Sequence, residues 1–168
     1  MTDHVLVIGI GNEYRADDAV GILLARRLKS LNLPDVGVIE QAGEGAALID
    51  TWESSGAQLV ILIDAVCSGA APGTIYRLDV NEETIPASFF NYSTHAFSLA
   101  EAVELARVLG KLPRHAVIYG IEGSQYAAGA GLSAAVKRAI PKALAKIIWE
   151  IEAVPRILNR RAQGVRAD

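Results

Sequence analysis

Two patterns of hydrophobic residues alternate along the chain. Continuous apolar runs, typical of strands buried on both faces of a sheet, occur at 4–10, 36–40, 57–64 and 114–121. Apolar residues that recur every three or four positions, as on one face of a helix, occur at 17–31, 44–52, 97–109 and 133–152. Strands that alternate with helices predict an α/β domain built on a mostly parallel sheet.

Two of the predicted helices carry further signals. In the first, one face carries Val20, Leu23, Leu24 and Leu28. The carboxylates of Asp17 and Asp18 lie in its first turn, where they interact favourably with the positive end of the helix dipole. The last contains Pro141, which removes a backbone donor. We therefore expect that helix to kink or restart at the proline and to end near residue 152.

The segments between these elements complete the predicted architecture. Residues 73–79 alternate apolar and polar side chains, as an edge or antiparallel strand does, and 80–95 form a long loop with aromatic content. The sequence predicts a three-layer α/β/α sandwich with a mixed, mostly parallel sheet of about five strands. We expect one domain over 1–153 and a disordered, arginine-containing tail over 154–168.

Composition narrows the classes of partner. The chain has 168 residues and a formal charge of −3, from 16 basic and 19 acidic residues, so it lacks the basic surface that neutralises nucleic-acid phosphates. Its apolar runs are far shorter than the roughly 20 residues that span a bilayer, and its first residues lack the basic start of a signal peptide. We expect a cytoplasmic protein that binds neither nucleic acid nor membrane.

Cysteine and histidine are scarce, which limits the possible metal sites. Cys67 is the only cysteine, so an intrachain disulfide and a zinc site of several thiolates are both excluded. The histidines are His4, His95 and His115. Any metal must therefore be held by oxygen and imidazole ligands.

Three polar residues lie where ligands bind in open α/β sheets, just beyond the carboxyl ends of strands. Asp18 follows the first predicted strand, Asp64 closes the third, and His95 ends the long loop. Two carboxylates and an imidazole suit a divalent ion such as nickel or zinc. Asp18 and His95 also have ordinary structural interpretations, as a first-turn carboxylate and as a neighbour of a helix N-cap. Asp64 is harder to explain in this way, because a carboxylate that ends a buried run is costly unless it is paired, caps a loop or binds something.

Two other kinds of chemistry have weaker support. The loop that begins Gly9-Ile10-Gly11 suggests a dinucleotide site, but Tyr14 replaces its third glycine, so we do not expect nucleotide binding. Cys67 and His95 could form a thiol nucleophile and its base, with Glu44 or Asp64 orienting the imidazole. A lone cysteine after a strand is more often a small packing residue.

The segment 5–21 (VLVIGIGNEYRADDAVG) resembles the N-terminal signature of the hydrogenase-maturation endopeptidases. Further similarity follows in order along the chain, so that the resemblance covers roughly residues 4–150. Its matching segments are Leu62 to Val66, Pro72-Gly73-Thr74, Ser93-Thr94-His95 and Gly131-Leu132-Ser133.

This resemblance implies a phosphorylase/hydrolase-like fold and an aspartyl-type endopeptidase whose metal-contacting residues are Asp18, Asp64 and His95. It also implies the reaction: removal of the C-terminal extension of a nickel-containing hydrogenase large-subunit precursor, once nickel has been inserted. Nickel then belongs to the substrate, where it serves as the recognition motif, and no permanently bound metal is expected.

The resemblance leaves the cleaving group open. No Ser-His-Asp set, H-E-x-x-H helix or pair of catalytic aspartates is visible. Our hypothesis is that nickel bound in the substrate, or a water near it, polarises or attacks the scissile carbonyl, with Asp18 or Asp64 handling the proton. Gly43, in Ala42-Gly43-Glu44, is the one match to a Gly-Gly-Thr-type element implied to recognise the precursor. A thiol peptidase and a non-enzymatic nickel or precursor chaperone remain the alternatives.

Overall fold

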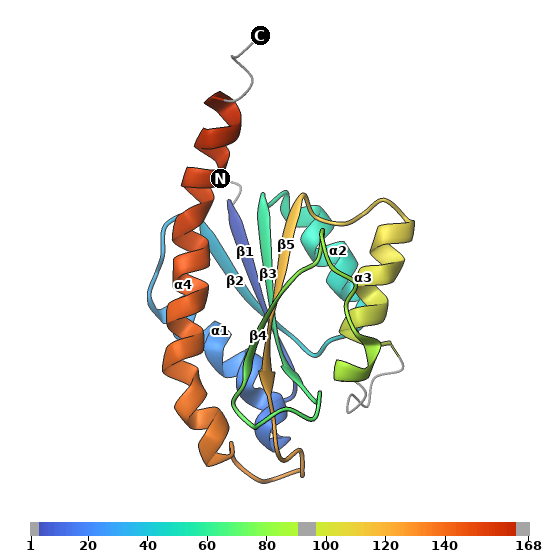
Figure 1. The fold of residues 1–168 in the computed structure, drawn as a ribbon, viewed down its shortest axis with the longest axis vertical. Coiled ribbons are helices and arrows are strands. Elements are labelled where there is room, and N and C mark those ends of the chain that lie inside the picture. Colours follow the sequence, from blue (N-terminus) through green and yellow to red (C-terminus); the bar gives the residue numbers. More distant parts are fainter. Residues whose placement is uncertain (1–3, 91–96, 164–168) are drawn as a thin grey trace.

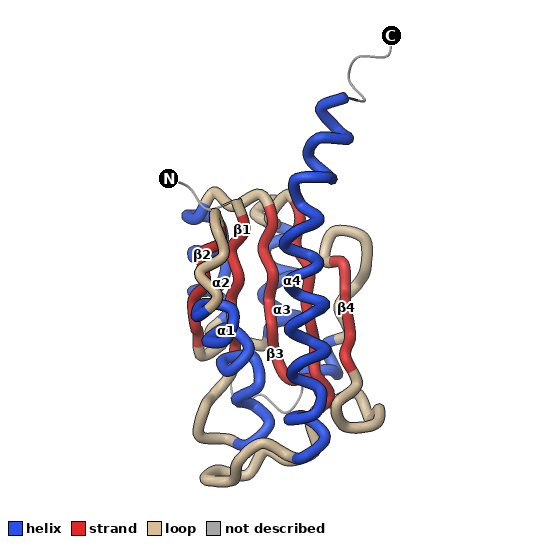
Figure 2. The backbone as a smooth tube through the Cα atoms, turned by 90° about the vertical axis from the view of Figure 1, so that its left-hand side faces the viewer, coloured by secondary structure: helices blue, strands red, loops and turns tan. Residues whose placement is uncertain are grey.

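A five-stranded mixed sheet forms the middle of the molecule (Figures 1 and 2). The computed structural model describes residues 4–90 and 97–163, with 155–163 as backbone only. The strand order is β2-β1-β3-β5-β4, and only the β4–β5 pair is antiparallel. The strands are β1 (Val5–Ile10), β2 (Val36–Gln41), β3 (Leu59–Val66), β4 (Ile75–Asp79) and β5 (His115–Glu122).

Helices cover both faces of this sheet. On one face lie α1 (Val20–Ser30) and α4 (Ala134–Gln163), and on the other lie α2 (Gly45–Ser55) and α3 (Leu99–Val108). Two 3-10 turns, η1 (Ala16–Ala19) and η2 (Ala87–Phe90), stand in the connections. The three-layer α/β/α arrangement predicted from the sequence is confirmed.

Side chains of the central strands divide between two hydrophobic cores. On β1, Val5 and Val7 point toward α1 and α4, whereas Leu6 and Ile8 point toward α2 and α3. Alternate residues of a strand face opposite sides of a sheet, so a continuous apolar run is needed when both sides are buried. This requirement explains why β1 has no polar side chain and why β3 has none before Asp64.

The last helix is longer than its sequence predicts. It runs through Pro141 without restarting and continues to Gln163, so the end predicted near Glu152 is wrong. Pro141 is exposed, while Ile140 and Ala143 beside it are buried against the sheet. Burial of Ile140 and of Ile147, one turn further on from Ala143, contributes about 1.5–3 kcal/mol each, which offsets the roughly 3 kcal/mol cost of a helical proline.

Residues 154–163 therefore belong to α4 rather than to the expected disordered tail, and 164–168 lie outside the described residues. Neither α4 nor any shorter helix within 4–90 and 97–163 carries an apolar stretch sufficient to cross a membrane. The proposed domain boundary at residue 153 stays a prediction.

Candidate functional site

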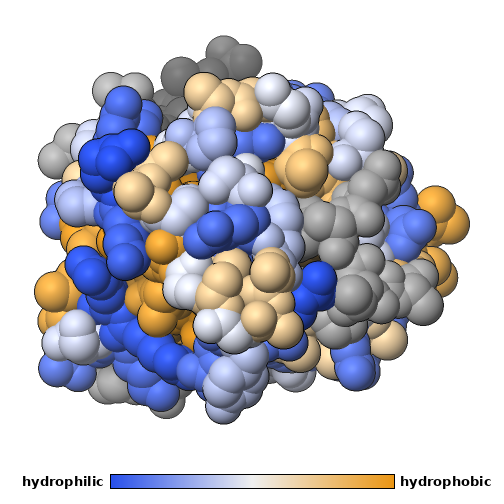
Figure 3. Space-filling model, turned by 90° about the horizontal axis from the view of Figure 1, so that it is seen from below, coloured by the Kyte–Doolittle hydropathy of each residue, from blue (hydrophilic) through white to orange (hydrophobic). Residues whose placement is uncertain are grey.

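A cleft of about 370 Å³ opens at the carboxyl ends of β1, β2 and β3. Figure 3 views the molecule from this end and shows apolar patches in a hollow between hydrophilic side chains. The lining comes from the segment after β1, the first turns of α1, the end of β2, and single residues of β3, η2 and α3. The charged residues among them are Glu13, Asp18, Arg26, Glu40 and Asp64.

Close packing of glycines brings Asp18 to the end of β1. A Cβ at Gly9 would overlap the Gly21 carbonyl oxygen, and a Cβ at Gly21 would overlap carbonyl oxygens of β1 and β3. Gly11 has φ +144° and also leaves no room for a side chain beside the Asp18 backbone. Since these positions carry no side chains, η1 and α1 lie directly against the strands, and Asp18 reaches the cleft while only 8 % exposed.

Asp64 reaches the same cleft because neighbouring strands end at different levels. The pairing of β1 with β3 stops at Gly9 and Ile63, whereas β3 continues beside β5 as far as Val66. Asp64 therefore lies within β3, two residues before its end, and not at the end as predicted. It is 6 % exposed and faces the space left beyond β1.

Of the other predicted site residues, Gly43 is found at the cleft and His95 is untested. Gly43 lines the cleft, is buried and has φ +94°, a left-handed backbone conformation that favours glycine. His95 lies outside the described residues, so its predicted place beside the two aspartates is untested. Within 4–90 and 97–163, no group of three or more His, Cys, Asp or Glu side chains is placed to hold a metal ion.

Cys67 and Glu44, which belong to the thiol alternative, lie outside the cleft that Asp18 and Asp64 line. Cys67 is exposed just beyond β3, and Glu44 is the exposed N-cap residue of α2. Neither belongs to the described residues that line the cleft.

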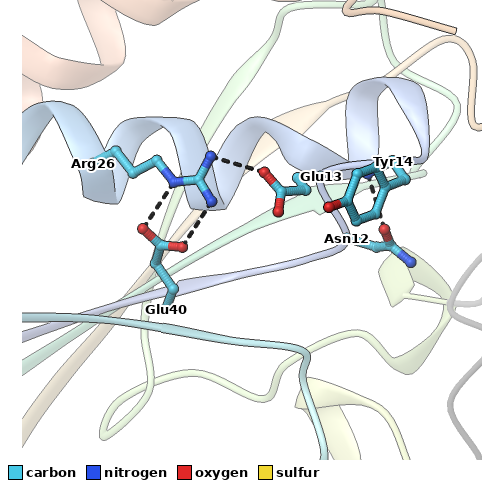
Figure 4. Close-up of polar contacts among 5 residues, drawn as sticks. All are labelled: Asn12, Glu13, Tyr14, Arg26 and Glu40. Atoms are coloured by element: carbon cyan, nitrogen blue, oxygen red, sulfur yellow. Dashed lines mark hydrogen bonds and ion pairs between the residues drawn. The ribbon is translucent and has the colours of Figure 1, made fainter. Parts of the chain in front are cut away.

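One wall of the cleft is held by an ion-pair network (Figure 4). Arg26 of α1 donates two hydrogen bonds to Glu40 of β2, at 2.9 and 3.1 Å, and one to Glu13, at 2.9 Å. The hydrogen bond from Arg26 lowers the pKa of Glu13, and the two carboxylates raise the pKa of Arg26. The network joins α1, β2 and the loop after β1, although such exposed pairs contribute little to stability.

A third aspartate of this region, Asp17, has a structural role that the sequence did not reveal. Asp17 is fully buried, and its carboxylate accepts backbone N–H bonds from Ser124 (2.8 Å), Gln125 (3.1 Å) and Ser133 (2.7 Å). Helical spacing was the available signal, because Asp17 precedes Val20 and Leu24 by three and seven positions, on the apolar face.

Glu122 is a second buried carboxylate with backbone partners. It lies at the end of β5, is 2 % exposed, and accepts bonds from the Ser68 and Gly69 N–H groups and from the Ser68 hydroxyl. The predicted strand ended one residue earlier, so this strand-end carboxylate was missed.

Asp18 and Asp64 thus give the cleft two nearly buried carboxylates with room beside them. Carboxylate oxygens are hard ligands that suit a divalent cation, and a carboxylate in a cleft can also accept or donate a proton. The geometry supports either task on a group that enters the cleft at the carboxyl-end face of the sheet.

A family model and similar proteins of known sequence all point to the same family. A family model described as hydrogenase maturation protease matches residues 22–150, a range that includes Asp64 but begins after Asp18. A putative hydrogenase maturation protease of Methanocaldococcus jannaschii is 32 % identical over 155 residues, which cover 88 % of this chain and 96 % of that protein. The hydrogenase 2 maturation protease of Escherichia coli is 29 % identical, with 91 % and 96 % covered.

Solved structures show the same similarity. The [NiFe] hydrogenase maturation protease HycI from Thermococcus kodakarensis superposes with a TM-score of 0.68 at 27 % identity, over 89 % of this chain and 92 % of that one. The hydrogenase maturating endopeptidase HybD from Escherichia coli gives a TM-score of 0.70 at 24 % identity, over 89 % and 93 %, and supports the fold alone.

Proposed function

The chain belongs to the hydrogenase maturation protease family and is a peptidase, and we propose that its substrate is the precursor of a nickel-containing hydrogenase large subunit. In this proposal it removes the C-terminal extension of that precursor in the cytoplasm, after nickel has been inserted. The names of the similar proteins support a hydrogenase as the partner, since one is named for hydrogenase 2 and another for [NiFe] hydrogenase.

The observation that carries the proposal is the pair of nearly buried carboxylates, Asp18 and Asp64, in one cleft at the end of the sheet. We propose that they contact nickel already held by the precursor, together with His95. A precursor without nickel lacks the cation that these two carboxylates would contact, so it gains no electrostatic attraction from them when it enters the cleft. Nickel loading would be checked in this way before the cut.

The same two aspartates are proposed to carry the proton during hydrolysis. One carboxylate takes a proton from the attacking water, whose oxygen bonds to the scissile carbonyl carbon, and the proton passes to the leaving amine as the C–N bond breaks. Nickel bound in the substrate polarises that carbonyl when it lies beside it. In this proposal the protein is an aspartyl-type endopeptidase, whose two carboxylates come from the turn η1 and the strand β3.

Gly43 is proposed to help recognise the precursor through its backbone. With φ +94° and no side chain, it presents main-chain atoms to the cleft at the end of β2. A substitution to alanine strains this conformation and narrows the entrance.

The intact mass of a large-subunit precursor, measured before and after incubation with the protein, tests the proposal. We expect loss of a C-terminal peptide from nickel-loaded precursor and little or no cleavage of nickel-free precursor. Equal cleavage of the two forms would reject nickel as the recognition motif while leaving the peptidase activity intact.

The alternatives give different results in the same assay. A thiol peptidase requires Cys67, so cleavage would be lost in Cys67→Ser and retained in Asp18→Asn, because Asp18 has no role in the thiol mechanism. A non-enzymatic chaperone would bind the precursor and leave its mass unchanged in every variant. Cleavage that depends on Asp18, Asp64 and His95, but not on Cys67, supports the proposed reaction.

A further inference from the structure

The strand β2 is an unprotected edge of the sheet. Among the described residues it pairs only with β1, and Figure 2 shows it at the opposite edge from β4. Protected edges carry lysine, proline, a bulge or inward-pointing charges, but the sequence of β2, VGVIEQ, has an apolar run and its one charge, Glu40, at the cleft end. Such an edge is a template for an additional strand.

The hydrogen-bonding groups on the outer side of β2 can be assigned from its pairing with β1. The N–H of Val5 donates to the Asp35 carbonyl, and the N–H of Gly11 donates to the Gln41 carbonyl. Backbone groups of successive residues in a strand point to opposite sides, so odd-numbered residues of β2 face β1. The N–H and C=O groups of Val36, Val38 and Glu40 consequently face away from the sheet.

A hollow of about 280 Å³ lies beside this edge. Its walls are the end of α1, the loop after it and the first half of β2, and it combines apolar and polar side chains. The lining residues are Leu28, Lys29, Asn32, Leu33, Val36 and Val38. A strand added to β2 would place every second side chain over this hollow, as in domains that bind peptides by strand addition.

The other half of the edge leads into the cleft. Glu40 to Gly43 line the cleft directly, so the outer edge of β2 runs continuously from the hollow to Asp18 and Asp64. At about 3.3 Å per residue, Val38 lies roughly 10 Å and Val36 roughly 17 Å from the Gln41 end of the strand.

We propose that an extended segment of the substrate polypeptide pairs with the outer edge of β2 and places an apolar side chain in the hollow. This apolar residue lies about three to five residues from the scissile bond. The inference rests on the proposed peptidase reaction on a hydrogenase precursor, and it adds the surface that aligns the peptide.

The continuity of this edge with the cleft favours substrate over a second copy of the chain as its occupant. A peptidase must hold its substrate extended past the cleaving groups, and this edge ends in the lining of the cleft that contains them. The other edge strand of the described sheet, β4, pairs with β5, and none of its residues lines the cleft. Of the two edges, β2 is therefore the one that leads into the cleft.

Backbone amide exchange, resolved residue by residue, tests the pairing in the wild-type protein with and without nickel-loaded large-subunit precursor. Addition of precursor should slow exchange at Val38 and Glu40 at least tenfold. Gly37 and Ile39 should change little, because their amides already face β1. This alternation is the signature of an added strand, and uniform protection across β2 or none at all would overturn the inference.

Variants of the edge test its effect on cleavage. Val38→Pro removes an outward N–H, and Ile75→Pro is the matched control, since both residues are partly buried against the same core and lie on edge strands. We expect Val38→Pro to lower kcat/KM about tenfold or more, as the loss of a backbone bond and a side-chain contact predicts, and Ile75→Pro to leave it near wild type. Val38→Lys, which keeps the N–H but brings charge to the hollow, should also raise KM if Val38→Pro does not fold.

The outcomes separate the inference from the proposed function. No cleavage of loaded precursor by the wild-type protein defeats the proposed function itself. Normal cleavage by folded Val38→Pro and Val38→Lys defeats only the edge-pairing inference. Protection of Val38 and Glu40 that appears without precursor and rises with protein concentration assigns the edge to a second copy, and overturns it as well.

Discussion

Two pairs of buried carboxylates lie at the same end of the sheet and differ in their surroundings. Asp17 and Glu122 are 0 % and 2 % exposed, and backbone N–H groups from distant loops donate to their oxygens. Asp18 and Asp64 are nearly as buried, at 8 % and 6 %, but they line the open cleft. The first pair we name the anchoring carboxylates and the second the cleft carboxylates.

Burial alone therefore does not distinguish a functional carboxylate from a structural one. Asp17 and Asp18 are neighbours in sequence, have the same side chain and belong to the same 3-10 turn. They differ in direction, because consecutive residues of a 3-10 turn point about 120° apart, toward the 123–133 loop in one case and toward the cleft in the other. Substitutions should separate the two roles.

The largest effect is expected for the cleft carboxylates. Asp18→Asn and Asp64→Asn keep the shape of the side chain but remove its charge and its capacity to take a proton. We expect kcat/KM for precursor cleavage to fall about 10²- to 10⁴-fold in each variant, with the free energy of unfolding within about 1 kcal/mol of wild type. Cleavage kinetics and urea denaturation of the same preparations measure both quantities.

A loss of stability of several kcal/mol in these two variants, with activity retained per folded molecule, would reverse the assignment of roles.

For the anchoring carboxylates the expected effect is on stability. Asp17→Asn replaces one acceptor oxygen by an NH₂ group that faces backbone donors, so at least one buried N–H loses its partner. We expect the free energy of unfolding to fall by about 2–4 kcal/mol, while the folded fraction still cleaves precursor. Thermal unfolding followed by circular dichroism, with Asp18→Asn as the matched neighbour, measures the difference.

A smaller, pH-dependent effect is expected at the opposite end of the sheet. Burial raises the pKa of Glu150, but hydrogen bonds from Arg77 and Tyr119 outweigh it, so the pKa is lowered from 4.5 in the folded state. A lowered folded-state pKa adds stability above pH 4.5, and this stability is lost as the pH falls below that value. Glu150→Gln should reduce stability at pH 7 by about 1–2 kcal/mol and flatten the decline between pH 5 and 3, as measured by urea denaturation.

The smallest effect is expected for Cys67. Its exposed side chain lies beyond β3 and outside the cleft lining that the described residues form. Cys67→Ser should leave kcat/KM within about twofold of wild type and the free energy of unfolding within about 0.5 kcal/mol. Loss of cleavage in this variant would restore the thiol mechanism and remove the distinction between the two carboxylate pairs.

The sequence predicted the layers of the fold because its local and global signals agree. Continuous apolar runs required strands buried on both faces, and the three-to-four-residue periods supplied the helices between them. Asp64 was found as a candidate because a carboxylate at the end of such a run is costly without a purpose. The resemblance then selected Asp18 and His95, of which His95 stays a prediction.

The anchoring role of Asp17 and the network of Arg26 could not be predicted in the same way. Their partners come from other elements, and the local pattern around each residue is that of an ordinary helix. Pro141 shows the reverse case, in which a strong local signal for a break yields to packing of the helix against the sheet. The bonds of Asp17, the ion pairs of Arg26 and the continuous helix at Pro141 all depend on tertiary contacts.

The bonds of Asp17 also bear on how the cleft is assembled during folding. They join positions 107 to 116 residues apart, a separation at which closing the chain carries a high entropic cost before the contact stabilises anything. The turn that carries Asp18 is therefore expected to be fixed only after β5 and the 123–133 loop are in place. A nascent chain would therefore lack the complete cleft until residues 124–133, which hold Asp17, have been added.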